Sequence, residues 1–306
     1  TGHGGEAILG AQVVAAMEAQ AFVESDVDRL IDCAISLIPK DSVIYRMIGD
    51  IREWHAAEAD WHKTRGRIAG LYNYENYGGN CHMVPNHALI ILGLLYGHDD
   101  FQEAMKVVNT AGWDTDCNSG NLGCLLGIKN GLAGLDAGPD WRGPVADRLF
   151  LAAADGGRSV TDALIETYHV VNAGRALHHE APIAPKNGAR FHFDLPGSLQ
   201  GFRAESESVS LANVAGHSQN GRRALALQFS GQGSVSTPTF ILPSELEMPG
   251  YALVASPTIY PGQILDVRLS AEEKMSVQLF MRAYNEKDEL SQINGPQIEL
   301  QAREFA

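Results

Sequence analysis

The stretch NTAGWDTDCNSGNLGCLLG, residues 109–127, places two carboxylates, Asp114 and Asp116, at the start of a glycine-rich apolar run. One interpretation is helix capping, because acidic side chains stabilise the first turn of a helix. The other is a cation site: two side chains at positions i and i+2 of a loop can point at one spot, and hard cations such as Mg²⁺ bind oxygen clusters of that kind. Asp, Thr, Asp and Asn stand within five positions here, which is more than one cap requires. These residues alone leave both interpretations open.

Glycine recurs behind the two aspartates at three- and four-residue spacing, at Gly120, Gly123, Gly127 and Gly131. Each glycine costs a helix about 1 kcal/mol relative to alanine. We therefore expect this helix to approach a neighbouring backbone closely. The pattern predicts a buried central helix that serves as a rigid support for the aspartates.

The first half of the chain has the period of amphipathic helices. Within residues 25–39, the apolar positions follow the spacing of one buried face, namely Val27, Leu30, Ile31, Ala34 and Leu37. Ser25 and Asp28 predict a capping box at the start of this helix. Similar patterns predict helices over residues 5–23, 41–57, 86–97, 100–112 and 159–174. These features indicate an all-α domain over residues 1–183, without the internal repeat of a solenoid.

From residue 184 onward, strand-like alternation replaces the helical period. Pro182 and Pro185 stand in a stretch that resembles a linker. Short strands separated by Gly and Pro are predicted over residues 224–230, 233–240, 251–260, 263–270 and 274–284. Strands of this length and spacing are typical of an antiparallel β-sandwich such as a jelly roll. The predicted fold class is therefore a multidomain α and β protein, with a β-sandwich over residues 184–306.

Composition excludes several classes of protein. With 45% hydrophobic and 20% charged residues, the chain reads as globular rather than disordered. Its net charge is −14, carried mostly by residues 1–185, which argues against nucleic-acid binding and is compatible with a divalent cation. No apolar run is long enough to span a membrane. The four cysteines show no CxxC spacing, so we expect reduced thiols and a cytoplasmic location.

Three segments resemble the ADP-ribosylglycohydrolase family. The most specific is GWDTDCNSGNLGCLLGIKNGLAGL, which begins at Gly112 and is similar to the family's C-terminal signature. The preceding CHMVPNHALIILGLLYGHDDFQEAMKVVNTA matches the family in spacing, and TGHGGEAILGAQVVAAMEAQAF resembles its histidine-containing helix start. The resemblance covers most of residues 1–180.

This resemblance implies a site with two Mg²⁺ ions, in which Asp114 and Asp116 are metal ligands. Cys117 falls where many members of the family have a threonine as a further oxygen ligand, and a thiol is a poor ligand for Mg²⁺. The predicted metal-ligand set is nonetheless Asp114, Asp116 and Cys117. No residue is assigned as the catalytic acid or base.

The resemblance also suggests residues that contact the substrate. His3 corresponds to a family histidine of the ADP-ribose pocket, and His82 and Asn86 are further pocket candidates. Trp113, beside the aspartates, could stack on a base or ribose. Packing remains an equal alternative for Trp113, and a half-buried histidine with satisfied hydrogen bonds is the alternative for His82.

Other parts of the family's metal site have no counterpart in this sequence. The family supplies further ligands from a Thr/Ser-Asp-Asp segment and from an acidic residue in its N-terminal half. The Asp99–Asp100 pair stands instead where the family has a helix start, which favours a capping role. The chain, which begins at Thr1 without a methionine, thus resembles the C-terminal part of the catalytic domain. We expect the missing half in cis or in trans.

The expected activity is Mg²⁺-dependent hydrolysis of a glycosidic bond to ADP-ribose or a related ribosyl group. One alternative is a metal-free glycosidase, which needs carboxyl groups about 5 Å or more apart on opposite sides of the bond. Another is a carbohydrate- or nucleotide-binding protein that uses the β-sandwich, with Tyr251, Tyr260 and Tyr284 as platform residues. A third is a non-catalytic descendant of the family. The expected partner is an ADP-ribosylated substrate or related small molecule, and neither nucleic acid nor a membrane.

Overall fold

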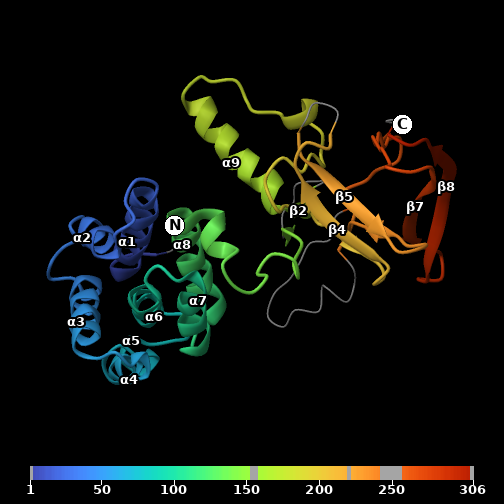
Figure 1. Cartoon of the computed structure of the whole chain (residues 1–306). Coiled ribbons are helices and arrows are strands. Elements are labelled where there is room, and N and C mark those ends of the chain that lie inside the picture. Colours follow the sequence, from blue (N-terminus) through green and yellow to red (C-terminus); the bar gives the residue numbers. More distant parts are fainter. Residues whose placement is uncertain (1–2, 152–157, 219–221, 242–256, 304–306) are drawn as a thin grey trace. The chain divides into compact units, whose positions relative to one another are not determined.

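A computed structural model describes residues 3–151, 158–218, 222–241 and 257–303 (Figure 1). The chain divides into two compact units, Thr1–Trp141 and Arg142–Ala306. The predicted domain boundary between residues 183 and 184 stays a prediction, since compactness alone does not define a domain.

The first unit is helical throughout the residues that the structure describes. Its helices are α1 (Glu6–Ala21), α2 (Val27–Ile35), α3 (Val43–Ala57), α4 (Trp61–Leu71), α5 (Tyr74–Tyr77), α6 (Met83–Gly97), α7 (Phe101–Thr110) and α8 (Thr115–Leu135). Each helix predicted in this part of the chain is present. Helices α4 and α5 were not predicted, because α4 is rich in polar residues and α5 has a single turn.

Helix α6 is the centre of this unit. Its sequence MVPNHALIILGLLYG is apolar on every side, and 13 of its 15 residues are buried. It packs against α1, α3, α4, α7 and α8. A helix with so little polar surface is stable only when its neighbours exclude water from all its faces.

Side-chain caps fix where the surrounding helices begin. The Asp26 carboxylate accepts from the backbone N–H of Arg29 at 3.0 Å, so the capping box predicted from Ser25 and Asp28 is wrong and the cap lies one residue later than Ser25. Asp100 accepts from the first turn of α7 at 2.9 Å and 3.1 Å. The capping role predicted for the Asp99–Asp100 pair is thus confirmed for Asp100, whereas Asp99 pairs with Lys129.

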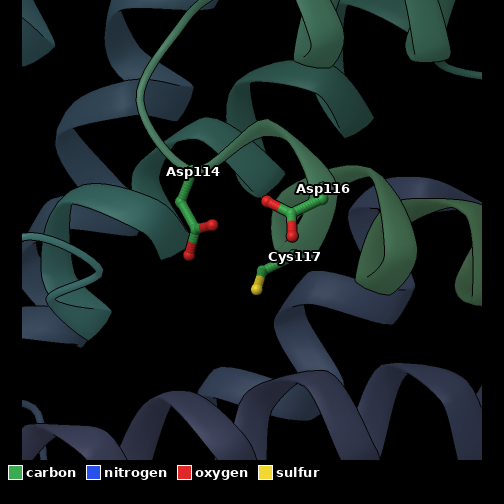
Figure 2. Close-up of side chains that lie close together, drawn as sticks. All are labelled: Asp114, Asp116 and Cys117. Atoms are coloured by element: carbon green, nitrogen blue, oxygen red, sulfur yellow. The ribbon is translucent and has the colours of Figure 1, made fainter. Parts of the chain in front are cut away.

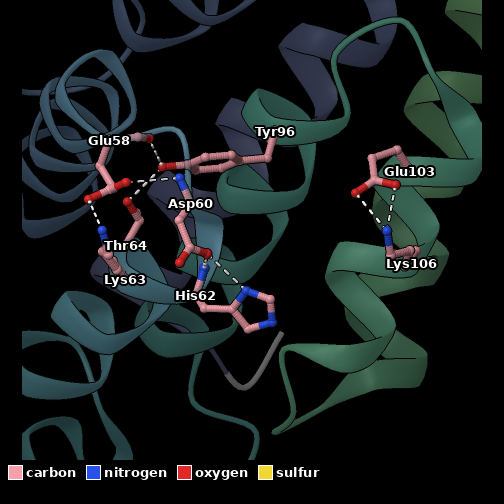
Figure 3. A network of polar contacts seen from close by, with 8 residues as sticks. All are labelled: Glu58, Asp60, His62, Lys63, Thr64, Tyr96, Glu103 and Lys106. Carbon is pink, nitrogen blue, oxygen red and sulfur yellow. Dashed lines mark hydrogen bonds and ion pairs between the residues drawn. The ribbon is translucent and has the colours of Figure 1, made fainter.

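A polar network ties the turn between α3 and α4 to α6 (Figure 3). The Tyr96 hydroxyl donates to the backbone carbonyl of Glu58 at 2.7 Å, and it lies 2.7 Å from the hydroxyl of the buried Thr64. The Glu58 carboxylate pairs with Lys63 at 3.0 Å. The exposed Lys63 ion pair contributes little, but the Tyr96 hydroxyl supplies a partner that the buried Thr64 hydroxyl needs.

The glycines of α8 do not make the close approach that their spacing suggested. An added Cβ at Gly120 or Gly127 would meet no atom within 4 Å in the described part of the chain, and Gly131 has a φ of 63° at a kink. Only four residues of α8 are buried. The expectation of a buried central helix at this position is therefore wrong, and α6 has that place.

Close helix approach occurs instead at two glycines of α6. An added Cβ at Gly93 would lie 2.6 Å from Leu122 of α8 and 3.2 Å from Val108 of α7. At Gly97 it would overlap the backbone N and Cα of Ala104 in α7. Because backbone atoms cannot move aside cheaply, Gly97 sets the separation of α6 and α7.

We expect Gly97→Ala to destabilise the first unit by about 2 kcal/mol or more, because the added methyl group must push α7 away. Gly127→Ala is the matched control. It meets open space, so it should be neutral or stabilising by up to about 1 kcal/mol. Urea unfolding followed by circular dichroism checks both, and equal effects of the two substitutions would contradict this account of Gly97.

His87 on α6 is a buried side chain for which the sequence gave no signal. It has no exposed surface, and neither ring nitrogen has a hydrogen-bond partner in the part of the chain that is described. Burial lowers the pKa of His87 from 6.5 to about 4. His87 therefore takes up a proton at a higher pH in the unfolded chain than in the folded protein. Its contribution to stability is complete above the pKa of the unfolded state and is lost as the pH falls towards the pKa of the folded state.

We expect the first unit to lose stability on the order of 3 kcal/mol through His87 between about pH 6.5 and pH 4. His87→Leu should flatten this pH dependence and leave the protein at least as stable at neutral pH, because it removes two unpaired buried nitrogens. Thermal unfolding at a series of pH values measures the slope. His169→Gln, an exposed histidine on another helix, should leave it unchanged, and an unchanged slope in His87→Leu would contradict the prediction.

The second unit combines short strands with one long helix. Its elements are β1 (Arg148–Phe150), β2 (Val160–Asp162), α9 (Ala163–Leu177), the 3₁₀ turn η1 (Pro185–Asn187), β3 (Arg203–Ala204), β4 (Val209–Val214), β5 (Ala224–Phe229), β6 (Val235–Ser236), β7 (Met275–Tyr284) and β8 (Leu290–Leu300). The β1–β2 hairpin lies within residues 1–183. That predicted all-α region is therefore helical but not purely so.

The strands form four antiparallel pairs, β1–β2, β3–β6, β4–β5 and β7–β8. Strands β5 and β7 confirm two of the predicted strands, and β6 covers only part of a third. Residues 263–270 form no strand in the described structure, so that prediction is wrong. Residues 251–256 of the remaining one lie outside the described residues. The closed β-sandwich stays a prediction.

None of the helices that the structure describes combines the length and apolar character needed to cross a membrane.

Candidate metal and substrate site

Asp114 stands at the N-cap position of α8 without acting as a cap. Its backbone has φ −85° and ψ 73°, and among the described residues its carboxylate accepts no hydrogen bond from the first N–H groups of α8. Asp116 lies in the first turn of the same helix. The capping interpretation therefore does not account for Asp114.

Three side chains converge at the start of α8. Ligand atoms of Asp114, Asp116 and Cys117 all lie within 4.8 Å of one another, and Figure 2 shows the three side chains close together at the start of the helix. Asp114 is half-buried, whereas Asp116 and Cys117 are exposed. Two convergent carboxylates fit a divalent cation, while the Cys117 thiol does not fit Mg²⁺ in particular.

Asp114 is held from the buried side of the site. The Asn86 side-chain amide donates to Asp114 Oδ2 at 2.8 Å, and Asn86 Oδ1 in turn accepts from the Tyr74 hydroxyl. Asn86 is 8% exposed and lies in the first turn of α6. The central helix thus reaches the cluster directly.

The turn before Asp114 has an unusual backbone that aromatic packing holds in place. Gly112 and Trp113 have φ values of 84° and 63°, and only glycine adopts the left-handed region without strain. The Arg65 guanidinium lies 3.9 Å from the centre of the Trp113 ring, and the Tyr74 ring lies 5.2 Å away. Arg65 Nε also donates to the backbone carbonyl of Ala111 at 2.7 Å.

A family model for ADP-ribosylglycohydrolases matches residues 1–174 of this chain. The chain belongs to this family. Comparisons with curated proteins and with solved structures gave no match. Membership indicates a hydrolase of the glycosyl type. The match runs from α1 through most of α9, so it includes all eight helices of the first unit that are described.

Two of the pocket residues expected from the ADP-ribosylglycohydrolase resemblance do not join the cluster. His82 is the N-cap of α6, and its Nδ1 accepts from the backbone N–H of Val84 at 3.2 Å. Its ring also lies 5.8 Å from Tyr77. This is the geometry of a half-buried histidine with a satisfied nitrogen. His3 is exposed near the start of the chain, and no hydrogen bond or ion pair joins it to the cluster within the described ranges.

Hydrogen bonds, charge and burial at the start of α8 shift the pKa values of Asp116, Cys81 and Cys117. A hydrogen bond with the Asp114 carboxyl, followed by backbone N–H groups of Asp116 and Cys117, lowers the pKa of Asp116. The nearby Asp114 charge raises the pKa of the Cys81 thiol. Burial first, and then Asp114, raises the pKa of the Cys117 thiol. The site therefore favours the ionised form of Asp116 and disfavours the thiolates of Cys81 and Cys117.

Sequence reasoning missed Tyr74, Arg65 and Cys81. Tyr74 and Arg65 stand in the two helices that were not predicted, and their contacts with residues 86 and 113 join distant parts of the chain. Cys81 precedes His82 in the quoted family segment, which was the one available signal. Contacts between residues so far apart in the chain leave no periodic pattern in the sequence.

In the metal-free protein, we expect Asp114→Asn to accelerate alkylation of Cys81 and Cys117 by iodoacetamide roughly threefold at about pH 8. The substitution removes the negative charge that disfavours the thiolates, but it keeps an oxygen for the Asn86 hydrogen bond. Cys33, an exposed thiol on α2, is the internal control. Mass spectrometry of the labelled peptides over a pH series gives the rates. Equal rates in both proteins would show that Asp114 does not act on these thiols.

Proposed function

We propose that this protein hydrolyses a glycosidic bond to ADP-ribose or a related ribosyl group, in a reaction that depends on Mg²⁺, with two ions as the family resemblance implies. The observation that carries the proposal is the convergence of the Asp114 and Asp116 carboxylates on one open face, with ligand atoms within 4.8 Å. Membership in the ADP-ribosylglycohydrolase family supplies the reaction class.

In this proposal, Asp114 and Asp116 would bind metal through their carboxylate oxygens, and Cys117, the third member of the predicted ligand set, lies beside them with a thiol that suits Mg²⁺ poorly. When bound, the cation orients the ribose hydroxyls and a water molecule and stabilises charge as the bond breaks. As metal ligands, neither aspartate is expected to serve as the acid for the leaving group. His3, His82 and Trp113 stay the substrate contacts that the family resemblance suggests, whereas the amide of Asn86, also predicted as a contact, is engaged by Tyr74 and Asp114.

A metal-free glycosidase fits the same residues poorly. That mechanism places one carboxyl group on each side of the scissile bond, about 5 Å or more apart. Asp114 and Asp116 are two positions apart at one helix end, and their ligand oxygens lie within 4.8 Å of each other (Figure 2). A substrate cannot fit between two groups that point at one spot.

We also propose partners and a location for this protein. The further acidic ligands of the family, in cis or in trans, would complete the second metal position. The partner is an ADP-ribosylated substrate or a related small molecule rather than nucleic acid or a membrane. A cytoplasmic location also stays a prediction.

The test is calorimetric titration of the 306-residue chain with Mg²⁺, and then with ADP-ribose in the presence of Mg²⁺. We expect binding in the wild-type protein and its loss in Asp114→Asn/Asp116→Asn, because the carboxylate charge that attracts the cation is removed. Asp28→Asn/Asp32→Asn is the matched control. It neutralises two exposed carboxylates of α2, which pair with Arg52, and should bind as the wild type does.

The outcomes separate the alternatives. Mg²⁺ binding without ADP-ribose binding would favour a non-catalytic descendant of the family that retains its metal ligands. Equal binding by the wild type and the Asp114→Asn/Asp116→Asn protein would place the metal elsewhere and refute the assignment of these ligands.

A further inference from the structure

A hydrogen-bonded chain leads from the half-buried Tyr74 through the buried Asn86 to one carboxylate of the proposed metal site. The Tyr74 hydroxyl donates to Asn86 Oδ1, and the Asn86 amide donates to Asp114 Oδ2 at 2.8 Å. Asn86 is 8% exposed, so water has little access to replace either partner. A buried amide with both ends engaged has a fixed orientation.

Asp114 needs such a constraint because the backbone of its helix does not provide one. An N-cap aspartate is ordinarily fixed by hydrogen bonds from the backbone N–H groups of the first turn, and within the described structure the Asp114 carboxylate accepts none from them. The Asn86 amide engages Oδ2, and ligand atoms of Asp114, Asp116 and Cys117 lie within 4.8 Å of one another. The orientation of this ligand therefore depends on Asn86.

The same tyrosine also supports the backbone that carries Asp114. Its ring lies 5.2 Å from that of Trp113, whose φ of 63° is costly for a residue with a side chain. Arg65 closes the other side, with its guanidinium 3.9 Å from the Trp113 ring centre and Nε bonded to the carbonyl of Ala111 at 2.7 Å. Tyr74 therefore contacts both the side-chain support and the backbone support of Asp114.

We infer that Tyr74, acting through Asn86, is a positioning residue that orients the Asp114 carboxylate for a divalent cation. This inference rests on the proposed function, since it concerns the same metal ligand. It assigns to Tyr74 and Asn86 a role that neither the family match nor the residue spacing gives them. Outer partners of this kind commonly change metal affinity by about 10- to 100-fold.

The test is Mg²⁺ titration of the full chain by calorimetry, with metal-free thermal unfolding of each variant. Tyr74→Phe removes the hydroxyl and keeps the ring against Trp113, and we expect Mg²⁺ to bind about tenfold more weakly. Tyr77→Phe is the matched control on the same short helix. Its ring faces Tyr72 and His82 instead, so affinity should not change. Both variants should unfold near the wild-type temperature.

A second variant distinguishes positioning from general packing. Asn86→Leu preserves the volume but has no amide, so it should weaken Mg²⁺ binding at least as much as Tyr74→Phe. Because Tyr74 acts through Asn86, adding Tyr74→Phe to Asn86→Leu should weaken binding no further. A structural role of the tyrosine would give additive losses.

Three results would overturn the inference. They are wild-type affinity in Tyr74→Phe, an equal loss in Tyr77→Phe, or additive losses in the double variant. In each of them the wild-type protein binds Mg²⁺ through its aspartates and the proposed function stands. If the wild-type chain itself bound no Mg²⁺, the metal-dependent function would fail and the inference would fail with it.

Discussion

Helix α6 has almost no polar surface, so it is stable only where other helices exclude water from each of its sides. With 13 of its 15 residues buried, it fixes the places of the helices around it, and Gly97 brings α7 against its backbone. The same burial makes the polar side chains of α6 rigid. Asn86, in its first turn, is a fixed donor because the helix that carries it cannot move independently of the core.

Helix α6 gives the site a rigid support, and helix α8 gives it access to solvent. Helix α6 contributes the buried Asn86, while α8 contributes Asp116 and Cys117, which are exposed. Asp114 lies between them, half-buried and bonded inward at 2.8 Å. A metal ligand needs solvent access to receive the cation and a fixed geometry to bind it well. Here the Asp114 carboxylate is supported from the core by Asn86, and Asp116, two positions along, is exposed to solvent.

The sequence predicted the features that local pattern determines. Apolar spacing located α1, α2, α3, α6 and α7, and the spacing of Asp114 and Asp116 made their convergence one of two interpretations, which the turn into α8 decides. Contacts over long sequence separations were not predictable in this way. Tyr74 reaches Asn86, and Arg65 reaches Trp113, only once α4, α5 and α6 have packed. The glycine spacing of α8 gave a wrong prediction for a related reason. Whether a glycine lies against another backbone depends on where the neighbouring helix packs, and the glycine spacing does not determine that.

Capping and metal binding at α8 are related by the electrostatics of a helix end. The N-terminus of a helix carries partial positive charge from its unpaired N–H groups, and that charge repels a cation. A hydrogen bond with Asp114, followed by the backbone N–H groups of Asp116 and Cys117, lowers the pKa of the Asp116 carboxyl. The Asp114 carboxylate accepts no bond from the backbone N–H groups of the first turn and accepts one from Asn86 instead. Two carboxylates at this helix start offset the repulsion of a cation by the helix end. An aspartate that merely capped α8 would direct its charge to the backbone N–H groups instead.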